Sequence, residues 1–159
     1  MKKLLIISLL CLLALPMQAQ RSIPKGYVDL GLPSGTLWKY SNEGVGDGFY
    51  TYNEAVRLFG NKLPTKSQWE ELKDYCEWTW RETERGYKVT GSNGKFIVLP
   101  AAGYRYCRGD VDRVGSLGYY WSSTPDGSDN AWILDFYSSS VRMRNNSRCY
   151  GESVRLVQD

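Results

Sequence analysis

The chain has 159 residues, with 20 lysines and arginines, 17 acidic residues and no histidine, which makes a formal net charge of +3. Cleavage of the N-terminal segment described next removes two lysines and leaves +1, too little to attract a phosphate backbone, so nucleic acid is not an expected partner. The absence of histidine excludes imidazole metal sites and nucleophiles that depend on a histidine base.

The first nineteen residues have the pattern of a secretion signal. Lys2 and Lys3 form a basic region, Leu4 to Leu15 an apolar run, and Ala19 a small residue at the expected cleavage site. The run is too short for a comfortable membrane span, although an uncleaved N-terminal anchor is the alternative. We therefore predict one domain over residues 20–159, secreted, periplasmic or on the cell surface, with no membrane span after cleavage.

The domain is expected to begin with two short strands and a helix. The strands are predicted over 27–32 and 36–38, on either side of a turn. Thr51 and Glu54 form a capping box that begins the helix, and Gly60 ends it.

A second amphipathic helix follows. Thr65 and Gln68 form another capping box, and the apolar residues Trp69, Leu72 and Cys76 lie along one stripe of the helix. The spacing predicts a helix that buries its tryptophan side, ends near Cys76 and keeps that thiol in the interior.

Strands dominate the rest of the chain. Trp78 and Trp80 alternate with polar residues, which favours a strand with one buried face over a sugar-stacking platform. Segments 87–90 and 95–99 form a predicted hairpin, with Asn93-Gly94 as the central pair of a type I′ turn. Four later strands are expected, over 119–123, 131–136, 141–144 and 153–157. Early helices and late strands predict an α+β fold.

Several blocks of the sequence carry a family resemblance. The segment Lys62–Leu72 is similar to a helix of the formylglycine-generating-enzyme and C-type-lectin-like superfamily. Further blocks resemble, in the same order, the Fibrobacter succinogenes major paralogous domain family: 27–38, 89–94, 99–105, 120–124 and 151–157. The resemblance implies a C-type-lectin-like single domain of the formylglycine-generating-enzyme type, with two early helices, short antiparallel strands and long C-terminal loops. It implies a secreted or surface protein of bacteria and little chemistry.

The cysteines argue against the enzymatic member of that superfamily. A formylglycine-generating enzyme needs two active cysteines near its C-terminal end, and here only Cys149 lies there. Cys107 and Cys149 form a disulfide only if their Cα atoms lie close enough, and the sequence does not reveal that separation. An oxidase is thus the third-ranked function, and no cofactor is predicted.

Calcium-mediated sugar binding is a further alternative. C-type lectins that use calcium carry Glu-Pro-Asn or Gln-Pro-Asp followed by Trp-Asn-Asp, and neither motif is present. Asp126, Asp129 and Asn130 offer three oxygen donors, fewer than a calcium site needs, so no metal site is predicted.

The C-terminal third has the composition of a binding surface. Between Tyr119 and Tyr150 the chain is dense in Tyr, Ser, Asn, Asp and Arg, the residues that dominate antibody paratopes. Arg142 and Arg144 alternate with apolar residues, so both should point outward from one strand. Interleaved core residues are Trp121, Leu134, Phe136, Val141, Met143 and Val154. The predicted ligand-binding residues are Asp126, Asp129, Asn130, Trp132, Asp135, Tyr137, Ser139, Arg142, Arg144, Asn146 and Tyr150. Arg155, also in the C-terminal block, is expected to pair with buried carbonyls or carboxylates.

These observations favour a non-catalytic module that binds an unknown protein or glycan at the cell exterior through its C-terminal loop face. The alternative is ordinary solvated surface on a structural or assembly subunit. C-type-lectin-like proteins diversified by retroelements vary in this region, and adenine-directed mutation yields Asn, Ser, Asp, Tyr and Arg. The resemblance therefore adds the hypothesis that residues 119–150 are diversified and 151–157 are constant.

Overall fold

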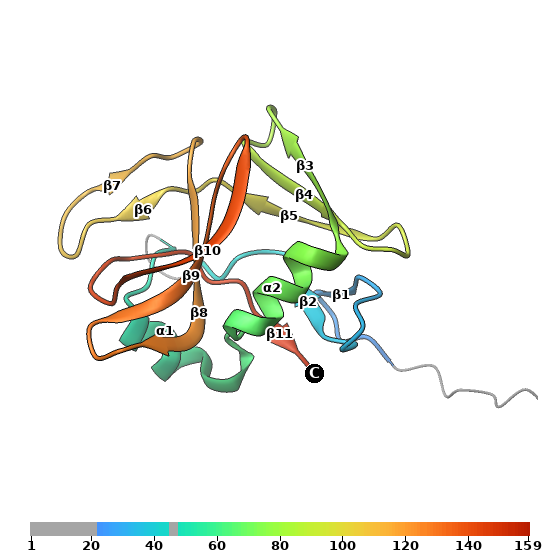
Figure 1. Cartoon of the computed structure of the whole chain (residues 1–159), viewed down its shortest axis with the longest axis horizontal. Coiled ribbons are helices and arrows are strands. Elements are labelled where there is room, and N and C mark those ends of the chain that lie inside the picture. The colour runs from blue at the N-terminus through green and yellow to red at the C-terminus, as the bar shows by residue number, and fades with distance from the viewer. Residues whose placement is uncertain (1–21, 45–47) are drawn as a thin grey trace, which may run out of the picture.

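The computed structural model describes residues 22–44 and 48–159, and Figure 1 shows the order of the elements. The expected signal segment, 1–19, lies outside these residues. Strands and bridges take up 42% of the structure and helices 16%, so the protein is mostly β. The expected α+β, C-type-lectin-like architecture is therefore wrong. The physical reason is that the C-terminal third, expected as short strands joined by long loops, pairs its backbone in a continuous antiparallel sheet of long strands joined by short turns.

The chain ends meet in one small sheet. Strand β1 (Tyr27–Asp29) pairs with β2 (Leu37–Lys39), and β2 pairs with β11 (Val157–Gln158), all antiparallel. Both predicted strands are confirmed, although β1 is shorter than the predicted 27–32 and β2 is shifted by one residue from the predicted 36–38. The strand predicted over 153–157 is wrong for most of its length, because only its last residue enters β11.

The first helix confirms its capping signal. Helix α1 (Tyr52–Phe59) begins after Thr51, whose side chain accepts a hydrogen bond from the Glu54 amide while Glu54 bonds back to Thr51. A 3-10 turn, η1 (Gly60–Lys62), then leads toward the second helix.

The second helix also follows its predicted pattern. Helix α2 (Lys66–Tyr75) begins after Thr65, with both halves of the capping box in place. Trp69 and Leu72 are fully buried. Cys76 follows the helix as a half-buried free thiol, and burial raises its pKa to about 11.

A three-stranded sheet comes next. Strands β3 (Glu77–Arg81), β4 (Gly86–Thr90) and β5 (Phe96–Pro100) pair antiparallel in that order. The predicted hairpin is confirmed, but its type I′ turn is wrong. A type I′ turn needs positive φ at both central residues, and of the Asn93-Gly94 pair only Gly94 has it, at 79°. The Asn93 amide instead donates to the Asp29 carbonyl at 2.9 Å, which docks a longer loop on β1.

The C-terminal third forms the longest sheet. Strands β8 (Gly118–Asp126), β9 (Asn130–Tyr137) and β10 (Ser140–Ser147) form an antiparallel meander with β9 in the centre. They confirm the three predicted strands and extend them. Before them, β6 (Tyr104–Arg105) and β7 (Val111–Asp112) form a small hairpin in a stretch expected to be loop.

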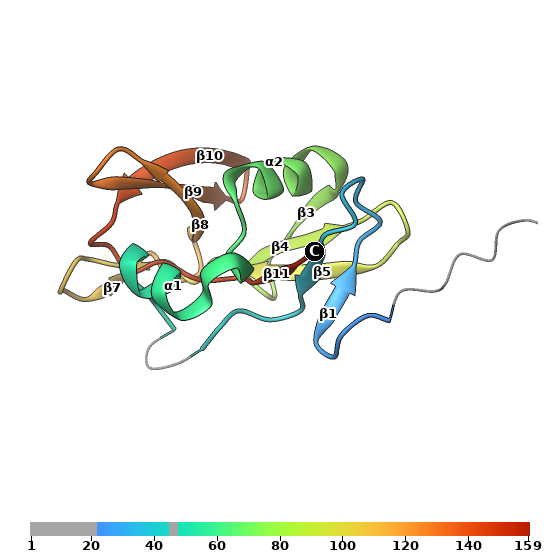
Figure 2. The same ribbon diagram turned by 90° about the horizontal axis from the view of Figure 1, so that it is seen from below.

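This meander is buried on both faces. Among the described residues, one core cluster joins Tyr120 and Leu134 to Trp69 of α2 and to β4 and β5. A second cluster joins Trp121 and Ile133 to Ala55 of α1. In Figure 2, α1 and α2 accordingly lie on different sides of the meander. Two-sided burial accounts for the uninterrupted buried run from Ile133 to Phe136 in the central strand β9.

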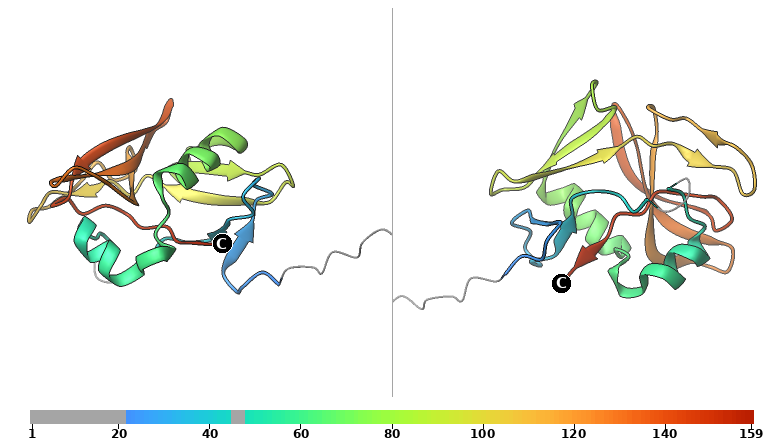
Figure 3. Two further views of the ribbon diagram at one scale, coloured as in Figure 1. Left: turned by 60° about the horizontal axis from the view of Figure 1, so that its bottom comes forward. Right: turned by 180° about the vertical axis from the view of Figure 1, so that it is seen from behind.

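A buried arginine ties the chain ends to the rest of the molecule. Arg155 is 1% exposed, and its guanidinium donates to the carbonyls of Lys39, Tyr40 and Val98 and to the Asn42 side chain. The predicted pairing with buried carbonyls is confirmed. Figure 3 shows this end of the molecule, marked by β11 and the C-terminus, far from the β6–β7 hairpin.

Candidate functional site

The register of the meander gathers several predicted site residues on one face. Asp135 of β9 pairs with Arg142 of β10 and with Tyr119 of β8, and side chains two residues apart on a strand share a face. Arg144 and Asn146 therefore lie on the same face as Arg142. The predicted alternation of the two arginines with apolar residues is confirmed, since Val141 and Met143 pack against the first core cluster.

Asp135 holds both arginines. Its Oδ2 lies 2.9 Å from Nε of Arg142 and 3.3 Å from Nε of Arg144. The Asp135 side chain is 2% exposed, whereas those of Arg142 and Arg144 are 54% and 40% exposed. Asp135 is thus not the ligand contact predicted from the sequence. It is a buried anchor that orients two guanidinium groups toward solvent.

A cluster of tyrosines lies beside the arginines. The Tyr104 ring contacts Tyr106, Tyr119 and Tyr150, with centroids 5.1, 5.1 and 5.8 Å away, and Tyr106 lies 5.9 Å from Tyr150. The Arg144 guanidinium lies 5.0 Å above the Tyr119 ring, which joins the two groups. We call this surface the Tyr–Arg face, made of Tyr104, Tyr106, Tyr119, Tyr150, Arg142 and Arg144.

The hydroxyls of the face are also linked. Tyr104 donates a hydrogen bond to the Tyr106 hydroxyl at 3.0 Å, and this bond, together with burial, raises the pKa of Tyr104. Tyr106 is 45% exposed, Tyr104 and Tyr150 are half-buried, and Tyr119 is buried. Tyr106 and Tyr150, which we call the outer tyrosines, therefore present ring and hydroxyl edges to solvent. They lie on the more deeply buried rings of Tyr104 and Tyr119.

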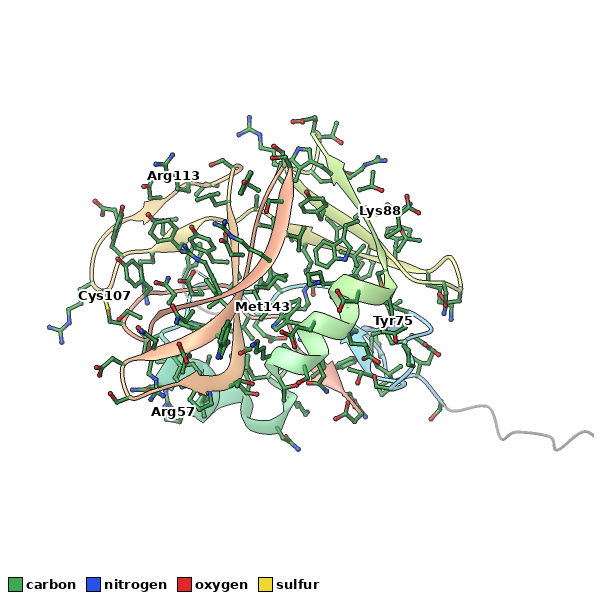
Figure 4. The ribbon with its side chains drawn as sticks, viewed as in Figure 1. Arg57, Tyr75, Lys88, Cys107, Arg113 and Met143 are labelled. Atoms are coloured by element: carbon green, nitrogen blue, oxygen red, sulfur yellow. A yellow bond between two sulfur atoms is a disulfide. The ribbon has the colours of Figure 1, made fainter. Side chains whose placement is uncertain are left out.

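A disulfide holds the outer tyrosines together. Cys107 follows Tyr106, Cys149 precedes Tyr150, and the two cysteines are bonded with their Cα atoms 4.6 Å apart. The bridge that the sequence left open thus joins the β6–β7 hairpin to the segment after β10. Figure 4 places Cys107 at the periphery of the molecule, so the bridge lies at the surface rather than in the core.

A buried carboxyl group lies behind the face. Glu152 is fully buried, its Oε1 accepts a hydrogen bond from the Asn146 amide at 2.7 Å, and its Oε2 has no hydrogen-bond partner among the described residues. Burial raises the pKa of Glu152 to about 8, with Asp135 raising it further and Asn146 and Arg144 opposing the shift. Glu152 is therefore mostly protonated at neutral pH. Asn146 faces this carboxyl group rather than a ligand.

Other predicted residues lie away from the Tyr–Arg face. Trp132 is on the opposite face of β9, where Lys66 Nζ lies 3.6 Å above its ring. Asp126 accepts a hydrogen bond from the Asn145 side chain. Both side chains make contacts within the protein. The sequence analysis predicted that they share a binding surface with the arginines, and the structure does not place them there.

The remaining predicted residues are in turns at the two ends of the meander. Tyr137 and Ser139 flank the β9–β10 turn, and both are exposed. At the other end, Asp129 lines a polar pocket, and the Asn130 carbonyl accepts a hydrogen bond from Arg148 at 3.0 Å. The predicted site is therefore divided among at least three places.

The acidic residues form no metal centre within the part of the chain that the structure describes. Over residues 22–44 and 48–159, no three His, Cys, Asp or Glu side chains come together in a way that would hold a metal ion. Nor does any described helix have the length and apolar character needed to cross a membrane.

Sequence reasoning missed Tyr104, Tyr106, Tyr119 and Glu152 as members of the site. Tyr104 and Tyr106 are two residues apart, which in a strand predicts a shared face, and this signal was present. No local pattern marks Glu152, because its burial depends on contacts with β10.

Comparison with known proteins adds one match. No curated protein and no solved structure matches the chain. The profile of one family matches residues 77–157, which run from β3 into β11 and include the whole Tyr–Arg face, the disulfide and Glu152. The chain belongs to this family, which is described as a domain of unknown function (DUF8237).

Proposed function

We propose that this protein is an exported, non-catalytic binding module whose ligand contacts the Tyr–Arg face. The observation that carries the proposal is the convergence of four tyrosines from three segments of the chain, with contacting ring centroids 5.1 to 5.9 Å apart, beside two half-exposed arginines. Tyrosine and arginine are enriched among residues that dominate binding energy, because each combines apolar contact area with directional hydrogen bonding.

Rigidity of the face supports the same function. The disulfide restrains the outer tyrosines, and Asp135 restrains both guanidinium groups. Side chains that are already ordered lose little conformational entropy when a ligand binds, so more of the contact energy appears as affinity.

The chemistry of the face defines the complementary ligand. Ring edges and hydroxyls favour a partner with apolar area and hydrogen-bonding groups, and the outer guanidinium N–H groups favour carbonyl or carboxylate acceptors. A glycan or a protein loop at the cell exterior has this combination.

The test is a binding screen with a matched control. The Tyr106→Ala/Arg142→Ala variant removes two exposed members of the face, and the Tyr75→Ala/Arg81→Ala variant removes the same residue types elsewhere. Tyr75 lies on the side of the molecule opposite Cys107 in Figure 4. Each protein is applied to a glycan microarray and to a displayed library of extracellular protein domains.

We expect the wild type and the control to bind the same targets, and the Tyr106/Arg142 variant to lose about 30-fold or more in affinity while still unfolding cooperatively well above the assay temperature. That loss corresponds to about 2 kcal/mol, the size of one hot-spot contact. Equal binding by all three proteins, or no target for the wild type, would contradict the proposal.

A further inference from the structure

A polar pocket of about 600 Å³ adjoins the Cys107–Cys149 disulfide. Its walls come from the N-terminal end of α1, the β6–β7 loop, the β8–β9 turn and the end of β10. The volume is within the range of small-molecule sites in proteins. Tyrosines of the Tyr–Arg face do not line this pocket, so it is a separate place on the molecule.

Two arginines in the pocket have no carboxylate partner among the described residues. Arg148 donates from Nε to the Asn130 carbonyl at 3.0 Å and from Nη2 to the Gly127 carbonyl at 2.8 Å, and its guanidinium lies 4.7 Å above the Tyr52 ring. Arg108 is exposed and makes no hydrogen bond or ion pair within the described part of the chain. One guanidinium is therefore held in place and the other is free to adjust, and both keep their positive charge available for an anion.

The rest of the lining consists of small polar groups. Asp129 adds one exposed carboxylate that has no ion-pair partner among the residues described, and Asn53, Ser128 and Ser147 add neutral donors and acceptors. None of the described residues that line the pocket is aromatic. A ligand that fits this set brings one acidic group for the arginines and several hydroxyls for the carboxylate, the amide and the serines.

We propose that this pocket binds a sugar acid, in which a carboxylate contacts Arg108 and Arg148 and a ring hydroxyl donates to Asp129. A neutral sugar would leave both arginines without an anion. A phosphate dianion carries twice the charge of a carboxylate and would meet about twice the repulsion from Asp129. A nucleotide base would find no aromatic side chain among the described lining residues on which to stack. An acidic peptide would supply the carboxylate but not the clustered hydroxyls.

The pocket has room for more than one sugar unit. A second pocket of about 510 Å³ shares Thr51, Cys107 and Arg108 with the first and adds Glu54 and Arg105, so a ligand that extends past Arg108 meets one further guanidinium and one further carboxylate. A chain of uronic acids would place successive carboxylates along this path. An oligomer should accordingly bind more tightly than its monomer, because the second unit binds at a high effective concentration.

The probe is trigalacturonic acid, titrated into ¹⁵N-labelled residues 20–159 at low salt and followed by amide chemical shifts. Galactotriose, which lacks the carboxylates, and N-acetylneuraminic acid, a sugar acid of different shape, are the comparison ligands. NMR suits the weak affinity expected of a site without aromatic stacking. We expect saturable shifts at Arg108, Asp129 and Arg148 with at least one of the two acids, and none with galactotriose.

Variants test the assignment of the charged groups. Arg108→Met removes a side chain that makes no hydrogen bond or ion pair within the described structure and should weaken binding at least 10-fold, and Asp129→Asn should weaken it several-fold. Arg81→Met, an exposed arginine on β3, is the matched control and should bind as the wild type does. Since Arg148 supports the β8–β9 turn, Arg148→Met is interpreted only if its amide spectrum retains the wild-type dispersion.

The test of the pocket can be distinguished from the test of the Tyr–Arg face. Arg142→Ala should leave sugar-acid binding unchanged, so failure of either proposal does not decide the other. Absence of saturable shifts with both acids, equal affinity for galactotriose, or unchanged binding by Arg108→Met would overturn the assignment of the pocket.

Discussion

Replacing Glu152 by glutamine should remove a pH dependence of stability that comes from one buried carboxyl group. The substitution keeps the shape of the side chain and its acceptor for the Asn146 amide. Burial raises the pKa of Glu152 from 4.5 to about 8 in the folded protein. Between these values the folded state keeps a proton that the unfolded state has released. The contribution of Glu152 to wild-type stability should therefore be greatest below about pH 4.5 and fall as the pH rises toward 8.

The size of the effect follows from the shift. Each pKa unit corresponds to 1.36 kcal/mol, so the full interval from 4.5 to about 8 represents about 5 kcal/mol as an upper value. Over the narrower range from pH 5 to pH 7, close to one proton is released on unfolding, which predicts a loss of about 2.5 kcal/mol. The hydrogen bond from Asn146 and the attraction of Arg144 both lower the pKa of Glu152, and the value of about 8 already includes their effect.

Urea denaturation at pH 5, 6 and 7, with the disulfide intact, measures the effect. The free energy of unfolding of Glu152→Gln should decline less than that of the wild type between pH 5 and pH 7, by about 2.5 kcal/mol. Other carboxyl groups cancel in this difference because both proteins contain them. Glu82→Gln, on an exposed residue, is the control and should follow the wild type. Parallel pH profiles for Glu152→Gln and the wild type would refute the reasoning, since Glu152 would then ionise as it does in the unfolded chain.

Two further predictions concern the restraints on the Tyr–Arg face. Asp135→Asn removes the carboxylate from both ion pairs, and because the arginines are half-exposed we expect a loss of about 2 kcal/mol in urea denaturation. A loss below about 0.5 kcal/mol would show that solvent screens these pairs. Cys107→Ser/Cys149→Ser opens a loop with a sequence separation of 42 residues. Chain entropy then predicts destabilisation by about 4 kcal/mol at 25 °C. The tyrosine fluorescence anisotropy should fall as the outer rings become mobile, and an unchanged Tm with unchanged anisotropy would contradict a restraining role.

Local patterns were sufficient for much of the secondary structure. Both capping boxes act within four residues of the chain, so Thr51 and Thr65 predict helix starts without any knowledge of the fold. The alternation of Arg142 and Arg144 with Val141 and Met143 likewise predicts their faces, because strand geometry alone sets a period of two. The Asn93-Gly94 turn shows the limit of such reasoning, since a contact with Asp29, 64 residues away, selects a longer loop.

The sequence by itself determined where helices begin, which strand faces are apolar, and that the C-terminal third is rich in residues suited to binding. Only the tertiary structure decided which of those residues meet. Tyr104 and Tyr150 come together through a disulfide and ring contacts between distant segments. Asp135 and Glu152 are buried because strands pack over them, which makes Asp135, a predicted ligand contact, an anchor and makes Glu152 a neutral acid. Pairing across the sheet and loss of water depend on three-dimensional neighbours, and so the composition of the site follows from packing rather than from local pattern.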